Sequence, residues 1–159
     1  MQRIGLGFDS HRFAPGRALV LGGVRIAGEQ GLAGHSDGDA VLHALTDAIL
    51  GALAAGDIGE HFPDTDPRWA GADSRVFLAE AIHLARERKM RVVNCDVTVV
   101  TERPRLSPHK DAMAAQIAEL LAVPAECVSI KAKTAEQMGA IGRGEGLAVL
   151  AAVLLTDAA

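Results

Sequence analysis

The chain has 159 residues, of which 49% are hydrophobic and 23% are charged, and its formal net charge at pH 7 is −4. This length suits one domain with its own core, so we expect a single domain over residues 1–159. The acidic balance excludes the basic surface with which proteins bind nucleic acid or an anionic membrane. Four Phe, one Trp and no Tyr are also too few for stacking on bases.

The sequence predicts a protein of the reducing cytoplasm. Its start, MQRIGLGFD, lacks the pattern of a signal or transit peptide. The longest apolar run, Leu147–Leu155, is shorter than the roughly 20 residues of a membrane span. Cys95 and Cys127 fall in segments with the pattern of strands, and we expect two buried reduced thiols rather than a disulfide.

The opening segment has the pattern of a β-strand. Ile4, Leu6 and Phe8 alternate with small or polar residues, so we expect these three side chains on the buried face. Asp9 and His11 then share the opposite face, because residues two apart on a strand point the same way.

A hairpin and a helix are expected next. The glycine pair at 22–23 predicts a hairpin over 18–26, since glycine tolerates the positive φ of such turns. A helix is predicted over 37–54, with Ser36 as its N-cap. Its apolar stripe consists of Val41, Leu45, Ala48, Ile49 and Ala52.

The rest of the chain alternates helices with strands. In chain order we predict a loop over 56–67, a helix over 74–89, a strand over 93–99, a helix opened by Ser107–Pro108, a strand over 128–132, a glycine-rich turn over 139–146 and a strand over 147–155. In the strand over 93–99, the residues expected to be buried are Val93, Cys95, Val97 and Val99. The pattern predicts an α/β (α+β) fold, with a mixed four- to five-stranded sheet covered by helices.

Two groups of polar residues suggest a metal site. Asp9 and His11 converge on one strand face, although such a pair also occurs by chance at exposed strand edges. On the predicted helix, Asp39, His43 and Asp47 are spaced four apart and share a face. Either this face is solvated, or the two acids orient the imidazole of His43. Should His43 meet Asp9 and His11, the donor set suits Zn²⁺ with an open fourth position. An ion of this kind polarises a phosphoryl oxygen or generates hydroxide, and the residues do not choose between these roles.

Three further segments suit phosphate or sugar contact. Gly34–Gly38 precedes a helix N-terminus, where free N–H groups attract anions. Phe62–Pro67 places two acids between prolines and forms either a binding loop or a rigid turn. Lys131–Glu136 follows a strand, and the Glu136 carboxylate is either an Mg²⁺ ligand beside a diphosphate or an ordinary acid at a helix start.

Taken together, these segments resemble the 2-C-methyl-D-erythritol 2,4-cyclodiphosphate synthases. The motifs that carry the resemblance span almost the whole chain and are GFDSHRF, LAGHSDGDAVLHALTDAILGALAAGDIGEHFPDTDP, GADSR, RPRLSPH and GRGEG. The resemblance implies a phosphorus–oxygen lyase of the non-mevalonate isoprenoid pathway. Its substrate would be 4-diphosphocytidyl-2-C-methyl-D-erythritol 2-phosphate, whose own 2-phosphate attacks the β-phosphate and expels CMP.

The resemblance also implies roles for individual residues. It makes Asp9, His11 and His43 ligands of zinc or a similar divalent transition metal, and Glu136 a ligand of magnesium or manganese. His35 and Thr134 would stabilise the transition state. The ribose contact would come from 57–59, the methylerythritol pocket from 62–66, and the cytidine pocket from 101–106 with 132 and 133. The implied substrate contacts are Asp9, His11, His35, Ser36, Asp57, Ile58, Gly59, Phe62, Pro63, Asp64, Thr65, Asp66, Thr101, Pro104, Arg105, Leu106, Ala132, Lys133, Thr134, Glu136, Ala140 and Arg143.

The resemblance implies a homotrimer with a central three-fold cavity near Arg143. Each active site would lie between subunits, with the metal ligands and the cytidine pocket drawn from different chains.

The sequence departs from the family pattern at two places near the end of the chain. Lys133, Thr134 and Ala135 stand where many relatives carry three threonines, and Lys133 either adds charge beside the diphosphate or points to solvent. Ala140 stands where many relatives carry a Phe near the cavity, so the resemblance leaves open whether an isoprenoid diphosphate binds there.

Two other functions fit the same residues. A zinc-dependent phosphohydrolase would use the ion to activate water and would release a linear phosphate. A non-catalytic trimeric protein would bind a diphosphate without turnover.

Overall fold

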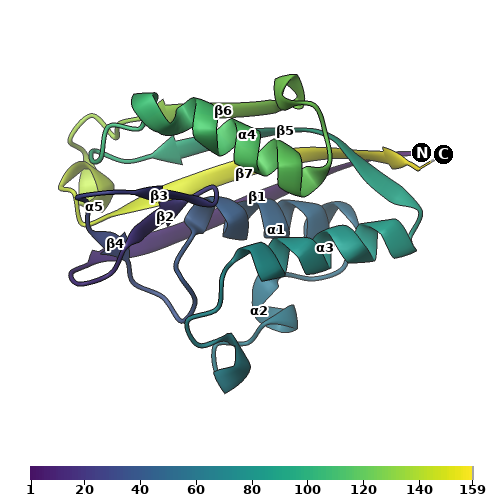
Figure 1. Ribbon diagram of the computed structural model, residues 1–159, viewed down its shortest axis with the longest axis horizontal. Helices are drawn as coiled ribbons and strands as arrows, with labels where there is room; N and C mark the ends of the chain where they lie inside the picture. The colour runs from purple at the N-terminus through teal and green to yellow at the C-terminus, as the bar shows by residue number, and fades with distance from the viewer. Residues whose placement is uncertain (159) are drawn as a thin grey trace.

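The computed structural model describes residues 1–158, which form a five-stranded sheet, a separate two-stranded hairpin and a layer of helices (Figure 1). The sheet order is β4-β1-β7-β5-β6, and its pairs are antiparallel except for the parallel pair of β5 and β6. The strands are β1 (Gln2–Ala14), β2 (Leu19–Leu21), β3 (Val24–Ile26), β4 (Gly31–Leu32), β5 (Met90–Val100), β6 (Val128–Lys133) and β7 (Gly146–Asp157). The helices are α1 (Ala40–Ala52), α2 (Ile58–His61), α3 (Arg75–Glu87), α4 (Lys110–Leu121) and α5 (Gly139–Gly142), with 3₁₀ turns at Pro67–Trp69, Ser107–His109 and Ala125–Cys127. The predicted mixed sheet with helices is confirmed.

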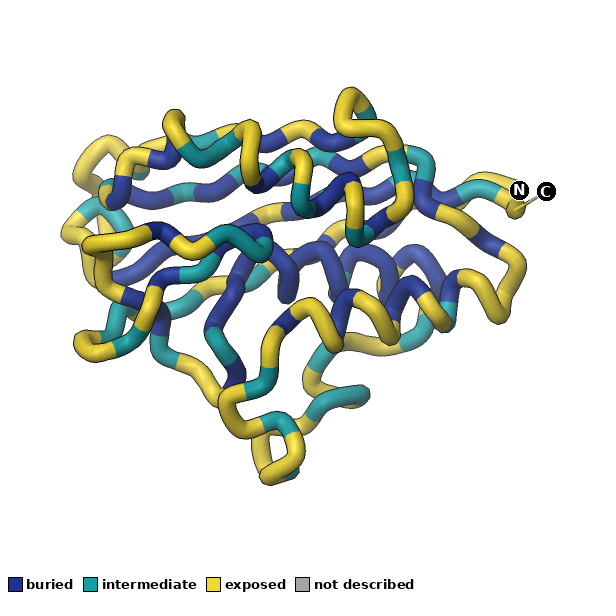
Figure 2. Tube along the Cα trace, in the orientation of Figure 1, coloured by how far each residue is buried: buried dark blue, intermediate teal, exposed yellow. Residues whose placement is uncertain are grey.

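Helix α1 lies against the centre of the sheet, and its close approach depends on two glycines of β1. A Cβ atom on Gly5 would lie 1.8 Å from the Ala48 carbonyl oxygen, and one on Gly7 would lie 1.9 Å from that of Ala44. Only glycine therefore lets the helix backbone reach the strand at these points. Figure 2 shows α1 as a mostly buried helix, in which all residues except Asp47 and Gly51 are buried.

The prediction that Ile4, Leu6 and Phe8 are buried is wrong. Their exposed fractions are 72%, 75% and 59%, because they lie on the face of β1 that turns away from the helices. The alternation itself is correct, but the glycine face is the one that packs against α1. Asp9 and His11 share this helix-facing side, so they point toward α1.

Helix α1 begins later than predicted, and its N-cap is Asp39 instead of Ser36. The Asp39 carboxylate accepts the Leu42 N–H at 3.0 Å and also the N–H groups of Gly22 and Gly23, at 2.9 and 2.7 Å. The cap therefore also ties the predicted β2–β3 hairpin, which is confirmed, to the start of the helix. Gly38 has a φ of 77°, which keeps the preceding residues out of the helix.

Several other boundaries differ locally from the prediction. In β5, Val92 is buried in place of Val93, because a bulge between Val92 and Asn94 shifts the alternation. The segment that begins at Ser107 starts as a 3₁₀ turn before α4, and the loops at 56–67 and 139–146 contain the short helices α2 and α5.

Both cysteines are free thiols, as predicted, but they differ in their surroundings. Cys95 is buried in β5, and burial raises the pKa of its thiol to about 12. Cys127 is only half-buried and lies in a 3₁₀ turn, where a buried strand position had been expected. Within residues 1–158, the longest helices fall short of the length and apolar character that a membrane crossing requires.

Candidate metal centre

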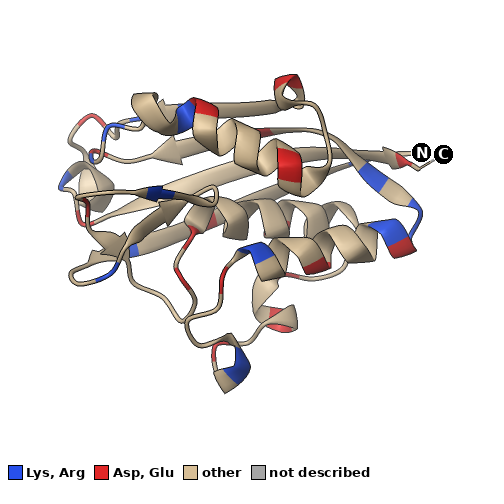
Figure 3. Cartoon of the chain, viewed as in Figure 1, with Lys and Arg blue, Asp and Glu red and all other residues tan. Residues whose placement is uncertain are grey.

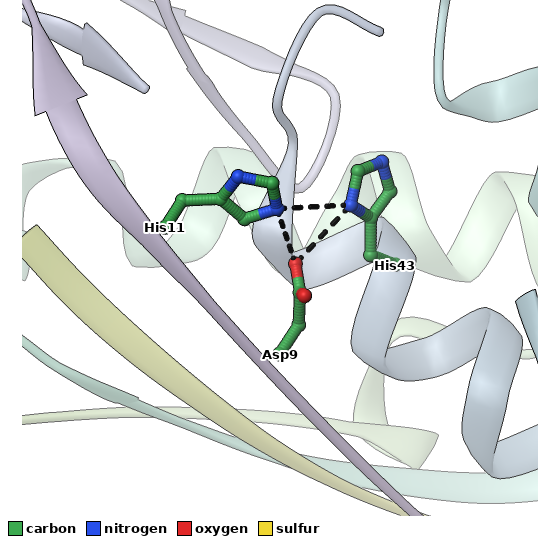
Figure 4. Close-up of side chains that lie close together, drawn as sticks. All are labelled: Asp9, His11 and His43. Atoms are coloured by element: carbon green, nitrogen blue, oxygen red, sulfur yellow. Dashed lines mark hydrogen bonds and ion pairs between the residues drawn. The ribbon is translucent and has the colours of Figure 1, made fainter. Parts of the chain in front are cut away.

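Asp9 and His11 of β1 meet His43 of α1 at one point (Figure 4). The Asp9 Oδ2 atom lies 2.8 Å from His11 Nε2 and 3.1 Å from His43 Nδ1, and the two ring nitrogens are 3.3 Å apart. The expected convergence of these three side chains is confirmed. It follows from the fold, since the glycine face of β1 brings α1 close enough for His43 to reach the strand.

The second nitrogen of His11 fixes the protonation of its ring. His11 Nδ1 lies 2.5 Å from the Ala33 carbonyl oxygen. A carbonyl oxygen only accepts hydrogen bonds, so we assign the proton of the neutral ring to Nδ1. The lone pair of Nε2 then points toward Asp9 and His43.

His43 is oriented by a chain of hydrogen bonds from two loops. Its Nε2 atom lies 2.8 Å from Ser74 Oγ and 3.1 Å from Ser36 Oγ. The Ser74 hydroxyl donates to the Asp37 carboxylate, so it accepts the proton from His43 Nε2. The lone pair of His43 Nδ1 is thereby directed at Asp9. Metal-binding imidazoles are usually held in this way, through the nitrogen that does not bind the ion.

Sequence reasoning placed different groups around His43. Asp39 and Asp47 orient the ring in one of the two predicted alternatives, but Asp39 caps α1 and Asp47 accepts the Ile58 N–H at 2.7 Å. The alternative of a solvated face is also wrong, because Asp39 is fully buried and His43 nearly so. The true partner, Ser74, lies in the GADSR motif, yet its pattern indicated only a helix start.

The three converging atoms fit a divalent cation. Bond lengths of about 2.0–2.1 Å and tetrahedral angles would separate the ligand atoms by about 3.3 Å, close to the observed 2.8, 3.1 and 3.3 Å. Burial alone would raise the pKa of Asp9 and lower that of His11. The two imidazoles beside Asp9 outweigh burial and lower the pKa of its carboxyl group, and Asp9 in turn raises the pKa of His11. The site therefore favours a carboxylate with positive charge beside it.

The three ligands open into a pocket of about 370 Å³. Its lining consists of Asp9, His11, His35, Ser36, His43, Ile58, Gly59, Phe62, Pro63, Asp64, Trp69 and Phe77. Trp69 and Phe77 were not predicted as site residues, since Phe77 has the spacing of a core stripe. Their rings pack with Phe62, at centroid distances of 5.2 Å for Trp69 and 4.6 Å for Phe77, and form an apolar wall.

The other residues expected in this region lie around the pocket. Asp57 caps α2 by accepting the Glu60 N–H at 3.0 Å, and Thr65 is exposed in the following loop. Asp66 pairs with Arg68, and its carbonyl oxygen accepts a hydrogen bond from His35 Nε2 at 3.1 Å.

A second group of predicted residues lies outside this pocket. Thr134 and Glu136 form an exposed turn after β6, where Thr134 Oγ1 donates to Glu136 Oε1 at 2.7 Å. The residues of 101–106 follow β5; Thr101, Pro104 and Leu106 are buried, whereas Arg105 is exposed. Pro104 and Arg143 line a separate cleft, while Ala140 lines a hollow beside Phe8 that His11 also borders. Within residues 1–158, the pocket of the Asp9, His11 and His43 triad does not include any of these residues, and their joining with it in one site stays a prediction.

The comparisons with known proteins agree on one relationship. The chain matches the YgbB family over residues 2–156. A Xanthomonas axonopodis pv. citri (strain 306) protein named 2-C-methyl-D-erythritol 2,4-cyclodiphosphate synthase is 58% identical over 153 residues, or 96% of this chain and 92% of that protein. A solved 2C-methyl-D-erythritol-2,4-cyclodiphosphate synthase in its CDP-bound form is 42% identical, with a TM-score of 0.89 over 97% of this chain and 100% of that one.

A longer protein contains the same fold. The bifunctional IspDF from Campylobacter jejuni is 44% identical, with a TM-score of 0.95 over 99% of this chain and 42% of that chain. The family match, the identity and the shared fold all cover nearly the full length of the sequence. The chain belongs to the YgbB family.

Proposed function

We propose that this protein is a 2-C-methyl-D-erythritol 2,4-cyclodiphosphate synthase that acts as a single domain over residues 1–159. It converts 4-diphosphocytidyl-2-C-methyl-D-erythritol 2-phosphate into the cyclic diphosphate and CMP. An oxygen of the substrate's 2-phosphate bonds to the β-phosphorus, and the bond from that phosphorus to the bridging oxygen of the α-phosphate breaks. CMP leaves with that oxygen, no water is consumed, and the reaction is that of a phosphorus–oxygen lyase of the non-mevalonate isoprenoid pathway.

One observation carries this proposal: the His, His and Asp atoms converge beside a pocket in a chain that matches named synthases over almost all of its length. The nucleophile belongs to the substrate, so the protein needs to position the phosphates and stabilise charge. The pocket suits this task, because it combines an apolar wall for the methylerythritol carbon chain with the polar groups of Asp9, His11 and His43.

Asp9, His11 and His43 would hold zinc or a similar divalent ion, and Glu136 would hold magnesium or manganese. Such ions supply positive charge that polarises phosphoryl oxygens. The chain's own groups fix the geometry. His35, which lines the pocket, would donate a hydrogen bond to the phosphate, and Thr134 would do so from the turn after β6 of a neighbouring subunit. Ile58 and Gly59, which line the pocket, would contact the ribose.

We propose a homotrimer in which the second group of residues meets the triad of a neighbouring subunit. Supporting this, Ile4, Leu6 and Phe8 form an exposed apolar row on β1, beside the half-exposed Leu150 of β7. Such a row is costly in water and typical of an interface. The separation of 101–106 and Thr134–Glu136 from the triad pocket also favours sites shared between chains. We expect the trimer to work in the cytoplasm, where both thiols stay reduced.

The direct test is incubation with the cytidylated substrate and Mg²⁺, followed by phosphorus NMR. We expect CMP and a cyclic diphosphate in equal amounts. A linear phosphate formed with uptake of water would instead identify a phosphohydrolase. Tight binding without CMP release would identify a non-catalytic diphosphate-binding protein.

The trimer is tested by light scattering of the protein as it elutes from a size-exclusion column. Leu6→Glu should reduce the measured mass from that of a trimer to that of a monomer.

A further inference from the structure

The turn that follows β6 has an unusual backbone. Glu136 and Gln137 have φ values of 52° and 62°, in the left-handed region that side chains other than glycine rarely adopt. Two such residues in a row persist only when the surrounding structure holds them. The sequence of this segment contains no glycine that would make the conformation easy. A contact from elsewhere must therefore stabilise the turn.

Glu102, in the loop after β5, provides this contact. Its Oε1 atom accepts the Ala135 N–H at 2.9 Å and the Gln137 N–H at 3.3 Å. Backbone N–H groups of a left-handed turn converge into a concave site that favours an anion. Here the anion is a carboxylate of the same chain, so the turn and the loop 101–106 are joined by charge-assisted hydrogen bonds.

The same two segments are joined at a second point. The Thr101 N–H donates to the Lys133 carbonyl oxygen at 2.9 Å, which continues the pairing of β5 with β6. Glu102 extends this contact past the end of the strands, into the loops around α5 where acidic and basic residues gather (Figure 3). The segment between the two contacts carries Thr134, whose hydroxyl donates to Glu136.

We propose that Glu102 is a positioning residue that holds Thr134 and Glu136 in place relative to the loop 101–106. Its role in catalysis rests on the proposed function, in which this turn contacts the diphosphate and this loop contacts the cytidine. Glu102 does not touch the reacting atoms. It fixes the distance between two parts of the substrate site by filling the anion site of the turn with its own carboxylate.

The contact is tested first without substrate, by hydrogen exchange with mass spectrometry. In Glu102→Ala, the amides of Ala135 and Gln137 lose their acceptor and should exchange faster than in the unmodified protein. Glu102→Gln should stay close to the unmodified protein, because one oxygen accepts both N–H groups and an amide oxygen can replace it. Glu119→Ala, at an exposed site on α4, is the matched control. Equal exchange in Glu102→Ala and the unmodified protein would overturn the proposal.

The positioning role is tested by CMP release. Misplacement of the turn by about 1 Å should lower kcat of Glu102→Ala by about 10²-fold. Glu102→Gln should recover most of this loss, and the zinc content of both variants should be unchanged, since the triad lies elsewhere. Should Glu102→Ala not fold, Glu102→Asp, with its shorter side chain, should show the same changes to a smaller degree.

Two results separate this inference from the proposed function. Faster exchange with an unchanged kcat in Glu102→Ala would refute positioning while leaving the synthase intact. An unmodified protein that releases no CMP would refute the synthase, and the catalytic role of Glu102 with it, whereas the exchange data would still decide whether Glu102 holds the turn.

Discussion

The two parts of the proposed site are held in opposite ways. Asp9, His11 and His43 belong to a long strand and a buried helix, and each imidazole has a second partner fixed by the fold. Thr134 and Glu136 lie on an exposed turn, where Glu102 supplies the side-chain contact from another loop. The metal centre is thus an extension of the core, whereas the turn depends on a surface contact. Substitutions where β1 contacts α1 should therefore disturb the metal centre together with stability, and substitutions at the turn should change only the handling of the substrate.

The largest effect is expected where the helix touches the strand. Gly7→Val adds a side chain whose Cβ would lie 1.9 Å from the Ala44 carbonyl oxygen. The strand and helix must separate, so the free energy of unfolding should fall by about 3 kcal/mol or more. Urea unfolding at fixed protein concentration measures this loss. Gly51→Ala on α1, whose Cβ would meet its nearest atom only at 3.7 Å, should be neutral or stabilising. Similar losses in both variants would contradict the close-packing account.

The hydrogen-bond chain behind His43 should matter next. Ser74→Ala removes the hydroxyl that connects His43 Nε2 to Asp37, and Ser36 alone remains at 3.1 Å. Loss of such a supporting group typically weakens metal binding by about 10- to 100-fold. Competition of the protein with a chelator for Zn²⁺ measures the change, with Ser107→Ala as the control at an exposed site. Equal affinity in Ser74→Ala and the control would show that the chain of bonds does not orient the ring.

The cap of α1 should contribute stability without touching the metal. Asp39→Ala leaves the N–H groups of Gly22, Gly23 and Leu42 without their acceptor, which should cost about 2 kcal/mol. Zinc affinity should change much less than in Ser74→Ala. Unfolding measurements combined with a zinc titration distinguish the two variants, and a weakened metal site with unchanged stability would contradict this assignment.

The buried Asp39 carboxyl group should also make the free energy of unfolding depend on pH. Burial raises its pKa from 3.8 to about 6, although three backbone N–H groups oppose the shift. The folded state then holds the proton more tightly than the unfolded state does, so the stability from Asp39 is full below pH 4 and is lost as the pH rises to about 6. The difference in stability between the unmodified protein and Asp39→Ala should narrow over this range. A difference that widens would mean that the carboxylate is preferentially ionised in the fold.

The smallest effect on the metal centre is expected from the exposed turn. Glu136→Gln keeps the shape of the side chain but removes its charge. CMP release should therefore need a higher Mg²⁺ concentration than in the unmodified protein. Its zinc content should equal that of the unmodified protein, because Glu136 is not among the three converging ligands. Elemental analysis checks this result, and stoichiometric loss of zinc would show that the two parts of the site are not separate.

Periodicity predicted much of the metal centre but not its surroundings. The spacing of Asp9 and His11, and the position of His43 opposite the apolar stripe of its helix, marked three candidate ligands, and the family resemblance implied that they share one ion. Alternation could not reveal which face of β1 is buried, since a run of Ile4, Leu6 and Phe8 suits either an interior or an interface. That choice depends on how closely α1 can approach, which the glycines at 5 and 7 decide.

The contacts between loops were beyond sequence reasoning. Ser74 contacts His43 across 31 positions of sequence. Glu102 contacts Ala135 and Gln137 across 33 and 35 positions. Neither residue belongs to a periodic pattern, so only the folded chain brings these partners together. The joining of the turn with the triad, which the proposed trimer would bring about, stays a prediction.

The most direct measurement is the metal content of purified His43→Ala beside that of the unmodified protein, together with CMP release from the cytidylated substrate. We predict close to one divalent transition-metal ion per unmodified chain and none in the variant. The variant should release no CMP yet keep the far-ultraviolet circular dichroism of the folded protein. A variant that binds no ion but retains full turnover, or an unmodified protein that takes up no such ion, would contradict the claim that these three side chains form the catalytic metal centre.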